Sequence, residues 1–446
     1  MNTLLLGGIC LLFGFVSFLP VSYFFSYKPG VFGLFINTLK FFPPAGVILL
    51  FAILIWNECL EGLKGILCGP VVPSIIFFEI IVFISSLGAP EPLLGLSRDV
   101  FYLITGPILC LLVVGGVKES MHIRRLVEVM FWTGVVVSCY GIMEFVMNRN
   151  PFFEDVFNVE NPLYAQFITG LHGARIISSV GHPVILGAYL IMIIPLGFVT
   201  VWEYSSWTHR MLKICGVLCM VCALLLTFSR GAWVGFAAGM VVYAGLRTWI
   251  MPRRDSLSLG HIVGKLALMV AIVAVFVAMI LSFERVSSTL AGRETWQQIR
   301  GFKKDPRGVA YGQVADIVSD HPLLGVGTAH YRYLAKRYGD VDDDTPDNGY
   351  LRYLAENGIL GLGAILVVFV GLFRTLLKQI GKGGNQKALG AGLSPDFIAG
   401  LVAGLSGFLV DLITCSALHI PLTRLTFWML AGLSLAVVKI TKNRNI

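Results

Sequence analysis

Charged residues are scarce in this chain of 446 residues: only 13% are Asp, Glu, Lys or Arg, whereas 56% are hydrophobic. The mean hydropathy of +0.79 is far above what a soluble domain needs. Nucleotide-binding sequences are also missing, because neither a Walker motif nor a GxGxxG pattern occurs. The composition excludes a soluble globular domain, and the chain cannot by itself draw on nucleotide hydrolysis.

The cysteines and acidic residues predict no metal centre. Nine cysteines lie in or beside apolar stretches, with no evident disulfide framework or CxxC metal site. Cys215, Cys219 and Cys222 share one face of a predicted helix, which we interpret as packing between helices rather than a ligand cluster. The acidic run Asp342–Asp344 is more typical of a solvated stretch than of a weak site for a divalent cation. We therefore expect no metal and no cofactor.

Long apolar runs recur along the whole chain. A bilayer core of about 30 Å requires roughly 20 apolar residues per helix. On this basis we predict an all-α polytopic membrane protein with about 12 transmembrane helices. The predicted spans are Leu4–Leu19, Val31–Trp56, Val71–Leu87, Val100–Val117, Val127–Met147, Pro183–Trp202, Leu212–Phe228, Ala232–Ile250, Ile262–Phe283, Tyr350–Phe373, Phe397–Leu418 and Thr426–Val438.

Basic residues predict the orientation. Lysines and arginines gather in the loops after the fourth, eighth and tenth spans and at the C-terminal end. Because cytoplasmic loops carry an excess of Lys and Arg, both termini are predicted to be cytoplasmic. This topology accounts for the net charge of +8, so we do not interpret it as a nucleic-acid footprint. The first apolar run lacks a basic n-region and a convincing cleavage site, which favours a first span over a signal peptide.

One long polar segment interrupts the membrane pattern. It divides the chain into residues 1–283 with nine spans, an outward loop at 284–348, and residues 349–446 with three spans and a cytoplasmic tail. Within the loop, apolar periodicity predicts an amphipathic helix over Val309–Ser319 that lies on the membrane face and ends before Pro322. Gly325 and Gly327 permit a turn with exposed backbone amides.

Three arginines on the predicted outer side are candidate anion ligands. Arg230 lies at the tight turn SRGAW, Arg307 begins the amphipathic helix, and Arg175 precedes the sixth span. The planar guanidinium suits bidentate contact with phosphate. For Arg230 the alternative is snorkelling to lipid headgroups, and for Arg175 a plain loop charge. An arginine between two apolar helices is costly unless it pairs or faces a wet cavity. The other outward arginines in similar contexts favour a functional role for Arg230.

Histidine, tyrosine and carboxylate side chains near these arginines are weaker candidates. His182 either supports the site or caps the helix that begins at Pro183. Tyr311 follows Arg307 by four residues, and His321 is interpreted either as a supporting residue or as loop packing. Of the carboxylates inside apolar spans (Glu79, Glu144 and Asp411), we expect a structural role more than a lipid-phosphate groove.

Three sequence elements occur in one order. They are SRGAW at an outer turn, R-x-x-x-Y with DHPLLGVG in the long loop, and DNGYLRYLAENGILG entering the next span. Over roughly Arg175 to Gly363 the chain resembles the O-antigen ligase and polymerase family of bacterial membrane glycosyltransferases. The resemblance implies a GT-C-like arrangement with one long periplasmic loop between spans 9 and 10, placed in the bacterial inner membrane.

The resemblance also implies a reaction. Family members transfer a glycan from undecaprenyl pyrophosphate to an acceptor hydroxyl on the outer face of the inner membrane. Arg230 and Arg307 match the two arginines thought to hold the donor pyrophosphate. The implied partners are the lipid-linked glycan donor, a glycan or lipid-linked acceptor, the phospholipid bilayer, and a chain-length regulator or a flippase.

One departure from the family pattern concerns the catalytic base. Ligases of this family typically carry His-Asn-x-Tyr-Leu entering the tenth span, whereas this chain has Asp347 where they have the histidine. The reference pKa is about 3.9 for aspartate and about 6.5 for histidine, so Asp347 needs burial or acidic neighbours to act as a base. The alternative is that Asp347 caps the helix, with Asn348 helping. Glu356 is a second candidate carboxylate for the base.

The residues suggest metal-independent transfer in which the arginines neutralise the leaving pyrophosphate. Attack by the acceptor hydroxyl from the opposite side inverts the anomeric carbon. The missing histidine favours a polymerase of surface-polysaccharide repeat units over a ligase that acts on lipid A-core. A secondary transporter is the alternative from a different class, but we find neither paired broken helices nor inverted repeats.

Overall fold

The computed structural model describes residues 2–18, 45–55, 67, 69–150, 175–201, 206–250, 306–338, 346–382 and 394–443. In chain order the elements are α1 (Asn2–Phe18), α4 (Val72–Leu87), α5 (Pro92–Leu103), η2 (Ile104–Ile108), α6 (Leu109–Gly116), α7 (Ser120–Met147), η3 (Ser178–Val180), α10 (Pro183–Thr200), α11 (Trp207–Leu226), α12 (Arg230–Gly245), η5 (Leu246–Ile250), α16 (Pro306–Asp320), α17 (Tyr331–Tyr338), α18 (Gly349–Lys382), α20 (Pro395–Asp411), η6 (Ala417–His419) and α21 (Pro421–Asn443). No strand occurs among these residues, which confirms the predicted all-α class.

Six helices in the described residues are long and apolar enough to cross a membrane. They are Pro92–Gly116, Ser120–Met147, Pro183–Thr200, Trp207–Leu226, Gly349–Ile380 and Pro421–Thr441. Helices α1, α4, α12 and α20 coincide with predicted spans but are shorter, at 16 or 17 residues each. The predicted ninth span, Ile262–Phe283, lies outside the described residues. A multi-pass membrane protein is thus confirmed, and the total of twelve spans stays a prediction.

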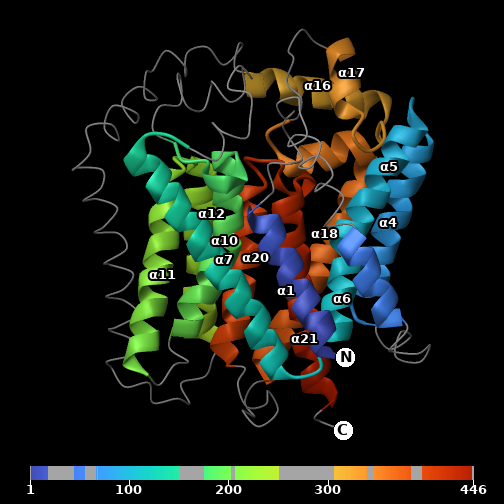
Figure 1. Ribbon diagram of the computed structural model, residues 1–446. Coiled ribbons are helices and arrows are strands. Elements are labelled where there is room, and N and C mark those ends of the chain that lie inside the picture. The colour runs from blue at the N-terminus through green and yellow to red at the C-terminus, as the bar shows by residue number, and fades with distance from the viewer. Residues whose placement is uncertain are drawn as a thin grey trace, which may run out of the picture.

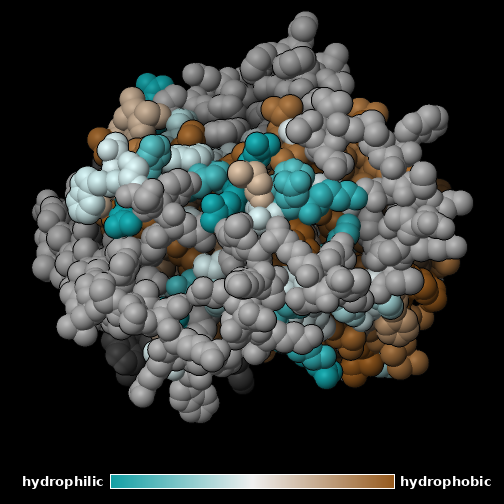
Figure 2. All heavy atoms as spheres, turned by 90° about the horizontal axis from the view of Figure 1, so that it is seen from below, coloured by the Kyte–Doolittle hydropathy of each residue, from teal (hydrophilic) through white to brown (hydrophobic). Residues whose placement is uncertain are grey.

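Both ends of the helical bundle carry polar elements. Figure 1 shows α16 and α17 across one end, while α1 begins and α21 ends at the opposite end. We call the end with α16 and α17 the loop end. Figure 2 views the opposite end, where hydrophilic residues gather in the middle of the face and hydrophobic ones lie along an edge. The predicted separation of the long polar loop from both termini is therefore present in the described helices.

Helices α10 and α21 form the centre of the helical bundle, because 94% of the apolar stretch of each helix is buried inside the protein. Helix α10 is apolar on every side, as expected of a helix enclosed by others. Helix α20 packs between α10 and α12. An added Cβ on Gly404 of α20 would lie 2.7 Å from the Met192 carbonyl oxygen of α10. The two backbones therefore approach closely through a small residue.

The contact between α12 and α20 is closer still. A Cβ added to Gly235 would lie 2.6 Å from the carbonyl oxygen of Gly407, and a Cβ added to Gly407 would lie 2.6 Å from that of Gly235. Gly239, one helical turn further on, meets the Ala403 carbonyl oxygen at the same distance. Small residues four apart on α12 thus let the two backbones touch. This contact fixes the position of the two helices relative to each other along their length.

Helix α18 is broken by a glycine. Gly358 has φ 66° and ψ −169°, outside the helical region, so the helix consists of a short first segment and a long second one. Ile359 and Leu360 donate their N–H groups to the carbonyl oxygens of Pro322 and Leu323, at 2.9 and 3.2 Å. The loop segment Pro322–Leu323 therefore caps the second segment of α18. The predicted start of the tenth span, Tyr350, lies in the first segment.

We predict that Gly235→Ala lowers the melting temperature of the purified protein. The added methyl group meets a backbone carbonyl that has no rotamer to change, and overpacking of this kind costs about 1–3 kcal/mol. Gly245→Ala on the same helix is the matched control, because its added Cβ meets no atom within 4 Å. Thermal unfolding in detergent measures both variants. Equal melting temperatures for the two would contradict the close helix contact.

Candidate functional site

Arg230 is the first residue of α12 and lies at the loop end with its side chain exposed. The next residue, Gly231, packs on the turn that follows α20. A Cβ at Gly231 would clash with Thr414 and lie 3.1 Å from Oδ1 of Asp411. The turn Asp411–Ser416 therefore lies directly beside the start of α12, and it sets the position of Arg230.

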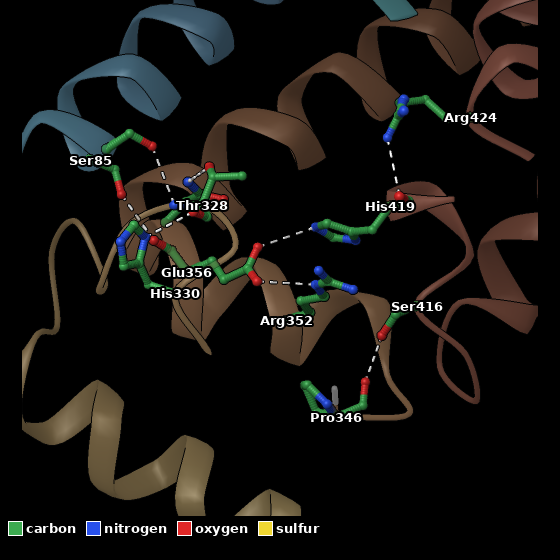
Figure 3. A network of polar contacts seen from close by, with 11 residues as sticks. Ser85, Thr328, His330, Pro346, Arg352, Glu356, Ser416, His419 and Arg424 are labelled. Carbon is green, nitrogen blue, oxygen red and sulfur yellow. Dashed lines mark hydrogen bonds and ion pairs between the residues drawn. The ribbon is translucent and has the colours of Figure 1, made fainter. Parts of the chain in front are cut away.

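The same turn holds the segment that contains Asp347. Gly349 donates its N–H to the carbonyl oxygen of Leu412 at 2.7 Å, and the Ser416 hydroxyl donates to the carbonyl oxygen of Pro346 at 2.6 Å (Figure 3). Asp347, between these two attachments, is exposed. The structure thus attaches Arg230 and Asp347, which are far apart in sequence, to one turn.

Asn348, the residue after Asp347, caps the start of α18. Oδ1 of Asn348 accepts hydrogen bonds from the N–H groups of Tyr350 and Leu351, at 3.0 and 3.1 Å. This is the geometry of an N-cap residue. The capping role considered for Asp347 is therefore carried by Asn348, and the exposed carboxylate of Asp347 is not used for it.

Arg175 lies against the turn that leads into α12. Its Nε donates to the carbonyl oxygen of Thr227 at 2.8 Å, and the N–H of Ile176 donates to that of Leu226 at 3.1 Å. The buried carboxylate of Glu144 accepts from the N–H of Ser178 at 2.7 Å and holds this segment from the other side. Glu144 thus has the structural role expected of it, and Arg175 is placed close to the segment that ends in Arg230.

His182 caps α10. Its Nδ1 accepts the N–H of Val184 at 3.3 Å, and its backbone is extended, as in an N-cap residue. Of the two interpretations of His182, the structure supports the helix cap.

Helix α16 spans Pro306–Asp320 and includes the helix predicted at Val309–Ser319. Its buried face, with Val314 and Ile317, packs on Tyr331 of α17 and Ala355 of α18. The apolar face therefore lies against protein, and the prediction that it rests on the membrane is wrong in this respect. Tyr311, 39% exposed, points away from this face.

Arg307 lies at the start of α16. It is the second residue of α16, so it opens that helix as predicted, but its side chain lies outside the described part of the protein. His321 is exposed directly after α16, and its N–H donates to the carbonyl oxygen of Ile317 at 2.8 Å. The described atoms thus place α16 at the loop end without showing a contact between Arg307 and Arg230.

Glu356 is enclosed. Its side chain is 1% exposed, with Oε1 at 3.2 Å from Nε of Arg352 and Oε2 at 3.6 Å from Nε2 of His419. Its carbonyl oxygen accepts the Ser85 hydroxyl and the Gly327 N–H, at 2.9 and 2.8 Å. The Glu356 carboxylate is therefore enclosed by protein groups, whereas the Asp347 side chain is exposed.

The network continues into residues that the sequence analysis missed. Arg424 donates from Nε to the Thr105 hydroxyl at 3.1 Å and from Nη1 to the carbonyl oxygen of His419 at 3.2 Å (Figure 3). Its guanidinium carbon also lies 4.0 Å from the ring centre of Tyr102. An arginine at the start of the apolar run LTFWML was the signal that could have found this site.

The loop segment before α17 joins this network to α4 and α5. Nδ1 of His330 lies 2.9 Å from the carbonyl oxygen of Thr328, and the Thr328 N–H donates to the Ser86 hydroxyl at 3.3 Å. Asp99 is fully buried nearby, with the side chains of Ser86 and Thr328 close to its carboxylate. Helices α4 and α5 therefore form one wall of the loop end, which the sequence motifs alone did not indicate.

In the described part of the chain, no group of three or more His, Cys, Asp and Glu side chains is arranged to hold a metal ion. The polar groups that the fold gathers at the loop end are arginines, carboxylates, hydroxyls and two buried histidines, His330 and His419. This set suits the binding of anionic oxygen atoms and the transfer of a proton.

These features define a multi-pass membrane protein with an arginine-containing polar site at one end of its helices. Residues 215–366 match the model of the family described as O-antigen ligase, which confirms the resemblance seen in the motifs. Over these residues the chain is similar to the O-antigen ligases. No curated protein matches the chain. The match includes Arg230, Arg307, Asp347 and Glu356, whereas the Asp411–Ser416 turn lies beyond it.

Buried His419 makes stability depend on pH. Burial lowers the pKa of His419 well below its usual range, and Arg352 and Arg424 lower it further. In the unfolded chain histidine has a pKa of about 6.5, so the unfolded state binds more protons as the pH falls. The stability that neutral His419 contributes is therefore present above about pH 6.5 and is lost progressively below it.

We expect the melting temperature to fall between about pH 7.5 and about pH 5.5, and His419→Gln to make this fall smaller. His209→Gln is the control, because His209 is exposed on α11 and near the other end of the bundle. A pH dependence in His419→Gln as steep as in the unchanged protein would show that other groups cause it.

Proposed function

We propose that this protein transfers a glycan from undecaprenyl pyrophosphate to an acceptor hydroxyl on the outer face of the bacterial inner membrane. Its loop end would face the periplasm, with both termini in the cytoplasm. The observation that supports this proposal most directly is the turn Asp411–Ser416, to which both Arg230 and Asp347 are attached. A cation and an exposed carboxylate placed by one turn suit a leaving pyrophosphate and an attacking hydroxyl.

In the proposed reaction the acceptor hydroxyl attacks the anomeric carbon of the donor glycan. Asp347 accepts the hydroxyl proton as the new carbon–oxygen bond forms. The bond from the anomeric carbon to the pyrophosphate breaks, and undecaprenyl pyrophosphate leaves with the electron pair. Arg230 and Arg307, with Arg175 behind the α12 turn, neutralise the charge on the leaving group without a metal. Attack from the opposite side inverts the anomeric configuration.

We further propose that the reaction is polymerisation of lipid-linked repeat units of a surface polysaccharide. The aspartate at position 347, where ligases of this family typically have histidine, supports polymerisation over ligation. Ligation to lipid A-core is the second candidate, supported by the description of the matching family as O-antigen ligase. Supplying purified protein with the lipid-linked repeat unit alone separates the two, because only a polymerase lengthens the glycan without lipid A-core.

Charge removal at the arginines tests the pyrophosphate clamp. We expect Arg230→Ala and Arg307→Ala each to reduce glycan transfer by about 100-fold or more, since each removes charge stabilisation that develops in the transition state. Turnover of a lipid-linked oligosaccharide by purified protein is the measurement. Arg98→Ala, an exposed arginine of α5, is the matched control and should retain activity. Full activity in the double variant of Arg230 and Arg307, at normal expression, would contradict the proposed role of the two arginines in binding the pyrophosphate.

The base is tested by two substitutions at one position. Asp347→Asn is expected to abolish transfer, because the amide does not accept the hydroxyl proton. Asp347→His is expected to keep measurable activity, with the acidic limb of the pH–rate profile moved to higher pH, since the reference pKa of histidine exceeds that of aspartate by about 2.6. An active Asp347→Asn would exclude Asp347 as the base. In that case Glu356→Gln, compared at the same expression level, tests the remaining carboxylate.

A further inference from the structure

Arg352 is held in a different way from the other arginine of the polar network. Its Nε lies 3.2 Å from Oε1 of Glu356, one helical turn along α18, and this is the one hydrogen bond of its side chain to the described residues. Arg424, in contrast, donates from both Nε and Nη1 to protein groups, and its Nη2 is buried. The guanidinium of Arg352 is thus fixed at one nitrogen, and its two terminal nitrogens are not used by the described part of the fold.

These terminal nitrogens are not sealed in the protein. The Arg352 side chain keeps 13% of its surface exposed, whereas that of Glu356 keeps 1%. Figure 3 shows the terminal nitrogens turned away from Glu356, toward the side of the network on which His419 and Ser416 lie. Glu356 therefore takes the inner face of the guanidinium and leaves the outer nitrogens open to a ligand.

Arg352 also lies close to the proposed reaction centre. Its N–H donates to the carbonyl oxygen of Asn348 at 3.0 Å, so Arg352 follows Asn348 by one turn on the same face of the helix. Asn348 is the cap next to Asp347, and Ser416 attaches the preceding residue, Pro346, to the turn beside Arg230. The open side of Arg352 thus belongs to the region that carries Arg230 and Asp347.

The local charge favours an anionic ligand. Arg352 and Arg424 each carry a positive charge, and Glu356 forms an ion pair with Arg352. His419 lies between the two arginines and Glu356 and stays neutral, because its pKa is well below the usual range. An arginine that is already held by a carboxylate loses little side-chain freedom when it binds a second anion, and its remaining N–H groups match two oxygens at once.

We propose that Arg352 is an anion-binding residue of the loop-end site, which takes phosphate or carboxylate oxygens on its two terminal nitrogens, while Glu356 is the positioning residue that orients it. The ligand follows from the proposed function: either the pyrophosphate of the lipid-linked donor or the carboxylate of an acidic sugar in the glycan. Both offer two oxygens at the spacing of the guanidinium fork.

Binding of two small probes to the full-length purified protein tests the assignment. Inorganic pyrophosphate represents the donor, glucuronate represents an acidic sugar, and thermal shift titration gives the dissociation constant of each. We expect Arg352→Gln to weaken binding of one probe by about tenfold or more, as for the loss of a hydrogen bond to a charged group. Arg352→Lys keeps the positive charge but loses the two parallel N–H donors of the guanidinium. Its affinity for the probe should therefore lie between those of the unchanged protein and Arg352→Gln. Arg98→Gln, an exposed arginine of α5, should bind as the unchanged protein does.

A second variant separates binding from folding. Arg352→Gln alone leaves the buried carboxylate of Glu356 without its ion-pair partner, and this can unfold the protein. The double variant R352Q/E356Q removes both charges, so it should fold and still bind the probe weakly. If the double variant bound both probes with wild-type affinity, Arg352 would be only the structural partner of Glu356. The same conclusion would follow if the unchanged protein bound neither probe.

The two probes also identify the ligand. A loss confined to pyrophosphate assigns Arg352 to the donor, and a loss confined to glucuronate assigns it to the glycan. Neither titration requires turnover. A protein that binds a probe through Arg352 but does not turn over lipid-linked oligosaccharide therefore overturns the proposed function and leaves the anion site standing.

Discussion

The backbone contact between α12 and α20 determines where the candidate site can form. Gly235 and Gly407 allow each helix to reach the carbonyl groups of the other, and nothing larger fits between them. Since both helices are rigid over their length, this contact also sets the relative height of their ends at the loop end. One end carries Arg230, and the other leads into the turn Asp411–Ser416 that receives the segment around Asp347. A glycine contact in the middle of the bundle therefore controls the geometry of polar groups at its edge.

The polar loop is attached to this frame by its backbone. Pro322 and Leu323 accept N–H groups from α18 after its break, and Val326 and Gly327 donate to Ala355 and Glu356 before it. The Thr328 hydroxyl adds a side-chain contact, because it accepts a hydrogen bond from Nδ2 of Asn357 at 3.3 Å. Gly325 has φ +66°, and a Cβ there would lie 2.5 Å from the Ala355 carbonyl oxygen, so this position does not accept a larger residue.

The sequence was sufficient for the parts of the fold that depend on local pattern. Apolar runs indicated the membrane helices, the SRGAW turn placed Arg230 at a helix start, and periodicity indicated the helix that Arg307 opens. The surroundings of that helix could not be predicted, because whether an apolar face meets lipid or protein depends on distant elements. Here α17 and α18 cover it. The break of the span at Gly358 could likewise not be predicted, because it depends on the distant loop segment that accepts the N–H groups of the broken helix.

Side-chain roles were predictable only where a neighbour in sequence decides them. His182 was recognised as a possible cap for the next residues, and it is one. In the sequence Asp347 was considered as the cap, with Asn348 helping, and only the structure assigns the cap to Asn348. Glu356 was considered a base because its chemistry allows it, but Arg352 and His419 enclose it. His419 lies 63 positions after Glu356 in the chain, so no local sequence pattern predicts the contact between these two side chains.

The break at Gly358 has an evolutionary consequence. Because the carbonyl groups of Pro322 and Leu323 satisfy the first N–H groups of a membrane-crossing helix, this short stretch of loop is part of the membrane domain in energetic terms. Asn348, at the end of the same loop, caps the first segment of this helix through its side chain. Insertions and deletions within Pro322–Gly327 would therefore disturb a membrane-crossing helix, so these residues are committed to the frame. Substrate range can change in such a protein while its anchoring of the loop stays constant.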